Sequence, residues 1–457
     1  MHVVLVSPVT AFEPARSGPY LGLAVLASSL KTLGISCTCI DCNFLPTAYP
    51  LGLKNIDEDN EAKILEECLS YIVSCKPDVV GISTWGSSLP FTIVLAKALR
   101  QRLGNIPIVV GGLFYVPLVK QLMRYSENID AVILGEAEVA FPEVLQRIRA
   151  NRGFIGIKGV AYRENSVIHC DNEVNYLDAG SWGKPEFSSF INPLQLEFFF
   201  HYLEGSRGCT YQCIFCCMRG QGLRRKFPQR LVQEMAALRE NKGVSRITLV
   251  DNFIPLQGAW IDDFCDLLIK RKLALNWSCF ARADHITYPI VRKMAIAGCS
   301  RIHLGVESVS PDTLGYINKA PVILDYLYRL RGNIKAILDY GISLRISATI
   351  GFPYEGVGDM ERTAEFALHL QGMGVTTAIG PVVVYPGSKM WDLYLDGKIE
   401  LCKIKRPYLR TFLGGLFATD FQDDPWIAPQ NFLPKHKFIG QEEYEEILSN
   451  CINAATL

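Results

Sequence analysis

Short apolar runs alternate with amphipathic stretches along most of this 457-residue chain, and no other sequence feature limits its fold as strongly. In residues 1–150, the apolar runs lie at 2–7, 35–40, 79–83, 106–110 and 131–134, and the amphipathic stretches lie at 21–33, 61–73, 91–103 and 140–149. Short Val- and Ile-rich runs separated by helices are typical of a parallel sheet that is covered on both faces. We therefore predict an α/β protein in which residues 1–150 form a doubly wound, Rossmann-like domain.

The alternation resumes after residue 192. The second set of apolar runs lies at 196–203, 246–250, 276–280, 301–304, 344–350 and 376–384, and the helical patterns lie at 229–241, 260–271, 288–297, 311–317, 323–340 and 360–371. Six strand–helix units predict a partial (β/α)6 barrel over residues 192–391. Residues 151–191, with a predicted hairpin at 156–163 and 166–170, are interpreted as a connector. Residues 392–457 are interpreted as a small C-terminal capping region that helps to set the substrate.

Composition excludes several classes of protein. The chain has 46 basic and 46 acidic residues, and a net charge of zero argues against a general nucleic-acid binder. No apolar run is long enough to span a bilayer, and residues 1–9 lack the pattern of a secretion signal. The 15 cysteines are scattered through strand- and helix-like stretches, which suits a reducing compartment better than a disulfide framework. We expect a cytoplasmic protein without a nucleic-acid partner or a membrane span.

Three cysteines are spaced at i, i+4 and i+7 after the first apolar run of the second set: Cys209, Cys213 and Cys216. Thiolates are soft ligands, and closely spaced cysteines hold iron–sulfur clusters. A four-iron cluster usually takes four thiolates, so three cysteines would leave one iron open. A zinc site is the alternative, although zinc sites prefer two close pairs and the nearest His is His201. A disulfide or a chance cluster also stays open, and Cys217 is interpreted as a bystander.

Polar or Gly-rich residues follow the predicted strands at the edge where parallel sheets bind ligands. In the first domain, the candidate ligand-binding residues are Gly18, Ser83, Thr84, Gly112 and Glu136. In the barrel, the candidates are Asp251, Asn252, Arg282, Asp284, Glu307, Ser308, Ser347, Phe352 and Pro353. Gly lets the backbone approach a ligand closely, and helix starts offer free N–H groups. For each single residue, a structural hydrogen bond at a strand end is the alternative interpretation.

The cysteine spacing, together with Phe215 before the last cysteine, resembles the signature loop of the radical S-adenosylmethionine (SAM) enzymes. The resemblance implies that Cys209, Cys213 and Cys216 hold a 4Fe–4S cluster whose open iron is chelated by SAM. It implies that Phe215 packs near the adenine. It also implies reductive cleavage of SAM to a 5′-deoxyadenosyl radical, with electrons from a flavodoxin- or ferredoxin-type donor.

From the first strand to about residue 391, the chain resembles the cobalamin-dependent members of that family. The resemblance implies that Glu307 and Ser308 lie near the ribose and amino-acid part of SAM, and that the turn at 351–355 backs the adenine. It implies that Arg282 and Asp284, the catalytic candidates, line the cavity between SAM and substrate. Asp251 and Asn252 would lie at the interface between the two domains.

Cobalamin binding by the first domain is part of the same resemblance. The sequence departs from one pattern of cobalamin domains, because the loop at residues 8–18 contains no His that could ligate cobalt from below. Many members of the group lack that His, but a domain that no longer holds a corrinoid stays open as an alternative.

The activity implied by the resemblance is methylation of an unactivated carbon in a specialised metabolite or peptide, with methylcobalamin as the methyl donor. A radical SAM dehydratase, epimerase, cyclase or ring-rearranging enzyme would use the same visible residues. A non-catalytic corrinoid- or cluster-binding protein is the alternative from another class. The basic segment at 219–226 is interpreted mainly as a solvated loop, with docking of an anionic electron donor as the second interpretation.

Overall fold

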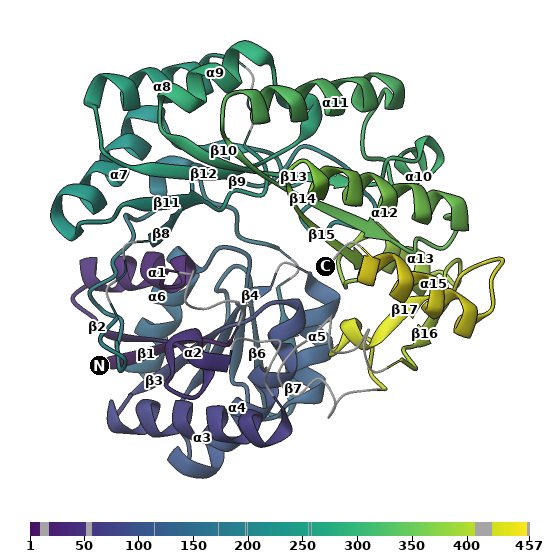
Figure 1. Ribbon diagram of the computed structural model, residues 1–457. Coiled ribbons are helices and arrows are strands. Elements are labelled where there is room, and N and C mark those ends of the chain that lie inside the picture. The colour runs from purple at the N-terminus through teal and green to yellow at the C-terminus, as the bar shows by residue number, and fades with distance from the viewer. Residues whose placement is uncertain are drawn as a thin grey trace. The chain divides into compact units, whose positions relative to one another are not determined.

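The computed structural model describes residues 1–9, 18–51, 57–113, 115–171, 173–196, 198, 200–254, 256, 258–406 and 423–454. The chain divides into two compact units, whose elements are labelled in Figure 1. One unit comprises Met1–Phe198 with Gly414–Asn431, and the other comprises Phe199–Leu413 with Phe432–Leu457.

The first unit is built on a sheet with the strand order β2-β1-β3-β4-β5-β6-β7. Its strands are β1 (His2–Ser7), β2 (Ser36–Asp41), β3 (Val79–Ser83), β4 (Ile108–Leu113), β5 (Ala131–Leu134), β6 (Val160–Glu164) and β7 (Val167–Cys170). Strands β1 to β5 pair in parallel, in the 2-1-3-4-5 order of flavodoxin-like sheets, which confirms the predicted doubly wound fold. The hairpin β6–β7 pairs antiparallel with β5, so this part of the predicted connector extends the first sheet.

Helices cover both faces of this sheet. Residues of α1 (Leu21–Thr32) and α6 (Ala137–Arg149) form one buried cluster with alternate strand residues such as Val3 and Leu5. Residues of α3 (Glu58–Ser74), α4 (Leu89–Leu103) and α5 (Val116–Tyr125) form the other cluster with Val4 and Val6. The sequence prediction omits α5, because its ten residues begin with a Pro in the first turn and bury only four side chains. The shorter helical elements of the unit are η2 (Cys42–Phe44), α2 (Ala48–Leu51), η4 (Gly86–Ser88), η5 (Ala179–Ser181) and η8 (Pro429–Asn431).

The second unit contains the predicted partial barrel, with six parallel strands in the order β15-β14-β13-β12-β11-β8. The strands are β8 (Phe200–Leu203), β11 (Arg246–Leu249), β12 (Asn276–Ala281), β13 (Cys299–Glu307), β14 (Ser343–Ile350) and β15 (Thr376–Pro381). The main helices are α7 (Pro228–Lys242), α8 (Ala259–Arg271), α9 (Tyr288–Ile296), α10 (Pro311–Tyr316), α11 (Ile323–Asp339) and α12 (Val357–Gly372). The predicted start of the first strand, near 196–199, falls partly on residues outside those described.

One face of the barrel sheet is buried under helices and the other face is open. Along β14, Leu344 and Ile346 are buried, whereas the alternate residues Ser343, Arg345 and Ser347 are exposed. Figure 1 shows α8, α9 and α11 together on one side of this sheet. Strand side chains alternate between the two faces, so the exposed set of β14 lines the open inner face of the partial barrel.

The predicted C-terminal region divides between the two units. Ile427 and Ala428 join the core of the first unit. In the second unit, α13 (Lys389–Leu395) precedes β16 (Leu401–Lys403), which pairs with β17 (Phe432–Pro434), and α15 (Gln441–Ala454) follows. Residues 407–422, which include much of the aromatic-rich tail, lie outside the described residues. Within the described ranges, no helix combines the length and apolarity needed to cross a bilayer.

Candidate active site

The three predicted cluster ligands lie in one loop, between β9 (Ser206–Arg207) and β10 (Arg224–Arg225). The backbone N–H of Ile214 donates to the carbonyl of Ile317 at the end of α10 (3.1 Å), and the N–H of Met390 in α13 donates to the carbonyl of Ile214 (2.9 Å). Gly208 has φ +83°, and a Cβ there would collide with the carbonyl of Gly222. The loop is therefore fixed by the barrel itself.

The thiols of Cys209, Cys213 and Cys216 lie near one another. Burial raises the pKa of Cys216 to about 11, and the neighbouring thiols of Cys213 and Cys209 act in the same direction. Burial also raises the pKa of Cys209, with a further contribution from Cys213. In the described part of the chain, no three His, Cys, Asp or Glu side chains converge on a single ion. A cubane does not need such convergence because each thiolate binds its own iron, so this donor set fits a 4Fe–4S cluster.

Two buried cations lie beside these thiols. Nη1 of Arg282 is 3.9 Å from Sγ of Cys213, and Asp284 orients the guanidinium through hydrogen bonds of 3.0 and 2.9 Å. Nζ of Lys319 is 2.9 Å from Oε1 of Glu307. Burial opposes the charged form of Lys319, but the negative charges of Glu307, Tyr326 and Cys213 together outweigh it, and the pKa of Lys319 rises to about 12. Both cations are thus charged at neutral pH and can stabilise the negative charge of three bound thiolates.

An aromatic cluster shields Arg282. The guanidinium lies 3.5 Å from the centroid of the Tyr211 ring, and the Tyr211 hydroxyl hydrogen-bonds Nε2 of His285. Phe253 packs edge-on against both rings, with centroid distances of 5.3 and 4.9 Å. The sequence prediction omits Tyr211, Phe253 and His285, because nothing in their spacing distinguishes them from ordinary core residues. Lys319 follows α10 in the chain, and its position downstream of the end of β13 is the one sequence signal that indicates a role.

Glu307 ends β13 in an unusual conformation. Its φ of +64° is rare for a residue with a Cβ, and the register between β13 and β14 shifts between Gly305 and Glu307. Such irregularities redirect side chains next to active sites. Here the carboxylate also accepts a hydrogen bond of 3.3 Å from Thr349, so it is held between that hydroxyl and Lys319.

The structure brings Phe215 and the turn at 351–355 together. Phe352 is fully buried, and its ring centroid is 6.0 Å from that of Phe215. The Glu355 carboxylate accepts hydrogen bonds from the N–H groups of Gly351 (2.7 Å) and Phe352 (3.2 Å). The carbonyl of Pro353 accepts the N–H of Lys437 (3.1 Å). The turn is therefore a rigid, largely apolar surface beside the cysteine loop.

Three other barrel candidates have different surroundings. Ser308 is fully buried, and its hydroxyl lies 3.1 Å from both the Thr363 hydroxyl and the N–H of Ser310. Asn252 is exposed, and Ser347 lies on the open face of β14 opposite Gly305. Ser308 is thus part of an internal hydrogen-bond network, whereas Ser347 is accessible to a ligand.

Asp251 holds the turn that precedes the cysteine loop. Its carboxylate is buried and accepts hydrogen bonds from the N–H groups of Gly205 (3.2 Å) and Ser206. Burial raises the pKa of Asp251 to about 7. The turn that it holds leads directly into the loop, so its contacts within the second unit are structural.

The interpretation of residues 219–226 as a solvated loop is wrong for Lys226. Its side chain is fully buried, and its Nζ lies 2.7 Å from Oε2 of Glu234 on α7. The run of basic residues could not show this, because the burial of Lys226 depends on the packing of α7 against this segment.

In the first unit, three of the predicted ligand-binding residues, Thr84, Glu136 and Gly112, make close contacts within the protein at the ends of the strands. Thr84 is buried, and its hydroxyl bonds that of Thr92 (2.8 Å). The Glu136 carboxylate accepts the N–H of Leu177 (2.7 Å). Gly112 has φ +91°, and a Cβ there would collide with the Thr84 carbonyl.

Other residues at the carboxyl ends of these strands leave space for a ligand. A Cβ added at Gly111 would meet nothing within 4 Å, which places open space over the end of β4. Ser83 hydrogen-bonds the Tyr20 side chain, and Trp85 after it is 51% exposed. Gly18 is buried and follows residues outside the described ranges. An open glycine backbone beside an exposed indole fits a large flat group such as a corrinoid.

Comparisons with known proteins agree with this arrangement. The family model of the B12 binding domain matches residues 9–145, and that of the radical SAM superfamily matches residues 203–367. An uncharacterized methyltransferase of Pyrococcus horikoshii is 26% identical over 425 residues, which cover 89% of this chain and 86% of that relative. An anaerobic magnesium-protoporphyrin IX monomethyl ester cyclase of Synechocystis sp. is 24% identical over 335 residues, covering 70% and 63% respectively.

Among solved structures, the fold is similar to the radical SAM methyltransferase TsrM of Kitasatospora setae with cobalamin and a 4Fe–4S cluster bound. The TM-score is 0.70 at 15% identity, over 99% of this chain and 88% of that one, which shows a shared fold. The two family matches lie in the order that the sequence predicts, and the thiol loop falls inside the second match. The chain therefore belongs to the radical SAM enzymes that carry a B12-binding domain, and its cofactors are a 4Fe–4S cluster, SAM and cobalamin.

Proposed function

We propose that this enzyme transfers a methyl group from cobalamin to an unactivated carbon of a small metabolite or peptide. The observation that carries the proposal is the combination of a B12-binding match over residues 9–145 with a thiol loop that is backed by Arg282 and Lys319. A radical centre and a methyl carrier in one chain supply the two chemical components that methylation of an unactivated carbon requires.

The residues of the barrel take the following roles in this proposal. Cys209, Cys213 and Cys216 hold the cluster, and Arg282 and Lys319 balance its charge. When bound, the cluster and SAM supply a primary carbon radical, and cobalamin supplies the methyl group. The protein's part is to exclude water and to fix the geometry.

The SAM side is formed by separate groups. The Phe215 and Phe352 rings provide the apolar surface for the adenine, and Gly351 lets the backbone turn beside it. Glu307 and Ser347 provide oxygen atoms for the ribose hydroxyls on the open face of the sheet. Arg282 and Asp284 stand between the cluster loop and the barrel interior.

Two names among the relatives point to different outcomes. The P. horikoshii relative and TsrM are both named methyltransferases, which supports methyl transfer. The Synechocystis relative is named a cyclase, which supports ring formation without methyl transfer as the second candidate. The same barrel residues serve both outcomes, so product analysis must separate them.

We further infer a cytoplasmic electron donor of the flavodoxin or ferredoxin type. A cluster that cleaves SAM by reduction needs an electron donor of low potential, and acidic donors dock on basic surfaces. The exposed Arg225 and the partly buried Arg224 flank the cysteine loop and supply such a surface, whereas Arg219 is paired with Asp392 at 3.0 Å.

The proposal is tested with protein purified anaerobically from cells supplied with iron and cobalamin. After reduction with dithionite and addition of SAM, we expect methylcobalamin to appear in the absorption spectrum with an equal amount of S-adenosylhomocysteine, together with 5′-deoxyadenosine. Cys213→Ala should abolish 5′-deoxyadenosine, whereas Cys217→Ala, the matched control, should not. Release of 5′-deoxyadenosine without S-adenosylhomocysteine would favour the second candidate, and release of neither would refute both.

A further inference from the structure

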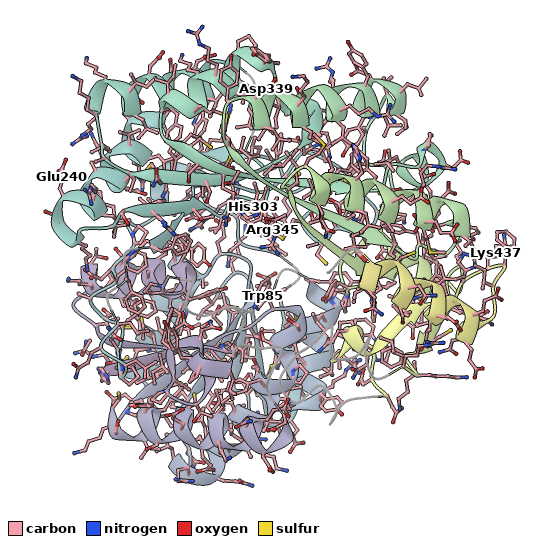
Figure 2. The ribbon with its side chains drawn as sticks, viewed as in Figure 1. Trp85, Glu240, His303, Asp339, Arg345 and Lys437 are labelled. Carbon is pink, nitrogen blue, oxygen red and sulfur yellow. The ribbon has the colours of Figure 1, made fainter. Side chains whose placement is uncertain are left out.

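A row of two arginines and a histidine crosses the open face of the barrel sheet, away from the cluster loop. His303 on β13 is in register with Arg345 on β14, and Arg301 lies two residues before His303 on the same face. Figure 2 shows His303 and Arg345 on the side of the sheet opposite α8, α9 and α11. These three side chains therefore point into the interior of the partial barrel.

The acidic groups of the barrel do not neutralise this row. Glu307 pairs with Lys319 at 2.9 Å, and Glu204 pairs with Arg207 at 2.6 Å. Throughout the described ranges, neither the Arg301 side chain nor the Arg345 side chain has an ion-pair or hydrogen-bond partner. Both arginines are exposed on this open face, so their guanidinium groups are available to an anionic ligand.

The positive charges of Arg301 and Arg345 act on the pKa of the neighbouring His303. Burial lowers the pKa of His303 to about 4, and the positive charges of Arg345 and Arg301 lower it further. His303 is thus neutral at physiological pH. It contributes a hydrogen-bonding ring and leaves the positive charge to the guanidinium groups.

An apolar surface adjoins these cations. Phe280 on β12 is in register with His303, and the two rings stack with centroids 4.7 Å apart and an angle of 27° between their planes. Phe280 is 41% exposed and Val250, beside the end of β11, is 37% exposed. Large exposed apolar side chains next to an interior positive charge mark a binding surface.

We propose that Val250, Phe280, Arg301, His303 and Arg345 bind an oxyanion of the substrate, a carboxylate or a phosphate, that adjoins a flat apolar group. The guanidinium fork matches both oxyanions in two-point contact. The inference rests on the proposed function, because it takes the barrel interior as the place of the substrate. Glu307 comes four strand positions after His303, so the anion would lie about 13 Å from the ribose side of the site.

The inference is tested by binding of three small aromatic probes to the holoenzyme as purified, without reductant. The probes are benzoate, phenyl phosphate and the neutral benzamide, and binding is measured by saturation-transfer NMR and calorimetric titration. We expect at least one anion to bind roughly tenfold more tightly than benzamide, and the preferred anion identifies the substrate's group. Arg345→Gln and Arg301→Gln should each weaken that binding by about tenfold.

Two further variants make the test specific. Arg345→Lys keeps the charge but not the fork, so its affinity should fall between those of the wild type and Arg345→Gln. Arg362→Gln is the matched control, because Arg362 pairs with Asp359 on the exposed surface of α12. It should leave probe binding unchanged.

The inference is overturned if benzamide binds as tightly as both anions, or if Arg345→Gln with a wild-type circular dichroism spectrum binds them as the wild type does. Probe binding needs neither SAM cleavage nor methyl transfer. A failure of the proposed function, seen as absent S-adenosylhomocysteine, is therefore distinguishable from a failure of the anion site.

Discussion

Nη1 of Arg282 lies 3.9 Å from Sγ of Cys213, and Asp284 holds the other side of the same guanidinium. A fixed positive charge beside a cluster ligand favours the more negative, reduced state of the cluster. In the proposed function, Arg282 therefore affects the ease with which the cluster accepts an electron.

The first prediction concerns this charge. The double variant Arg282→Met/Asp284→Asn removes both charges and leaves no buried ion without a partner. We expect the reduction potential of the cluster to fall by on the order of 50 mV, as followed by electron paramagnetic resonance during redox titration. Arg282→Lys keeps a positive charge and should retain most of the potential. An unchanged potential in the double variant would show that Arg282 has only a packing role.

The second prediction concerns the pH dependence of stability. Burial raises the pKa of Glu355 from 4.5 to about 7. Its protonated form is favoured by folding, so the full stability is present below pH 4.5 and is lost as the pH rises through 7. The loss amounts to about 3 kcal/mol. Glu355→Gln should therefore be relatively more stable than the wild type at pH 8 than at pH 5, as measured by chemical denaturation.

Other buried carboxylates, such as Asp251, also titrate in this range. The informative quantity is consequently the difference between the wild type and Glu355→Gln, which cancels those contributions. A difference that stays constant between pH 5 and pH 8 would contradict the assignment to Glu355.

The third prediction compares two adjacent glycines at the end of β4. Gly112→Ala forces a Cβ into a left-handed conformation against the Thr84 carbonyl, and we expect a loss of about 1–3 kcal/mol in unfolding free energy. Gly111→Ala meets nothing within 4 Å and should keep its melting temperature. If the corrinoid lies over this strand end, Gly111→Ala should nevertheless retain less cobalamin after purification. Wild-type cobalamin content in this variant would place the corrinoid elsewhere.

The fourth prediction concerns Trp85, whose backbone N–H donates to the Ser88 hydroxyl (3.0 Å) while the indole stays 51% exposed. A corrinoid that stacks on this ring should quench its fluorescence and gain about 1 kcal/mol of binding energy. Trp85→Ala should therefore bind hydroxocobalamin several-fold more weakly and lose part of the quenching. Phe227→Ala, an exposed aromatic of the second unit, is the control. Equal quenching in wild type and Trp85→Ala would remove the indole from the binding site.

Much of the fold could be predicted because buried parallel strands have an unmistakable sequence pattern. The predicted strands 79–83 and 131–134 coincide with β3 and β5. By contrast, 301–304 covers only part of β13, because Gly305 and the register shift before Glu307 hide its last residues from a pattern of apolar runs.

The candidate site was predictable only where the residue type itself carries chemistry, as in Cys209, Cys213 and Cys216. The partners that give them their environment come from distant elements. Lys319 follows α10, and His303 meets Arg345 only because β13 and β14 pair in one particular register. The register between parallel strands depends on the crossover helices and cannot be predicted from the sequence of either strand alone.

The turn at 351–355 is held by groups that come almost a hundred residues later. The Tyr444 hydroxyl donates to the carbonyl of Gly351, and His436 Nε2 bonds the carbonyl of Glu355 (2.7 Å). During synthesis, the ribosome must therefore release α15 before this turn, the proposed adenine surface, has all of its contacts.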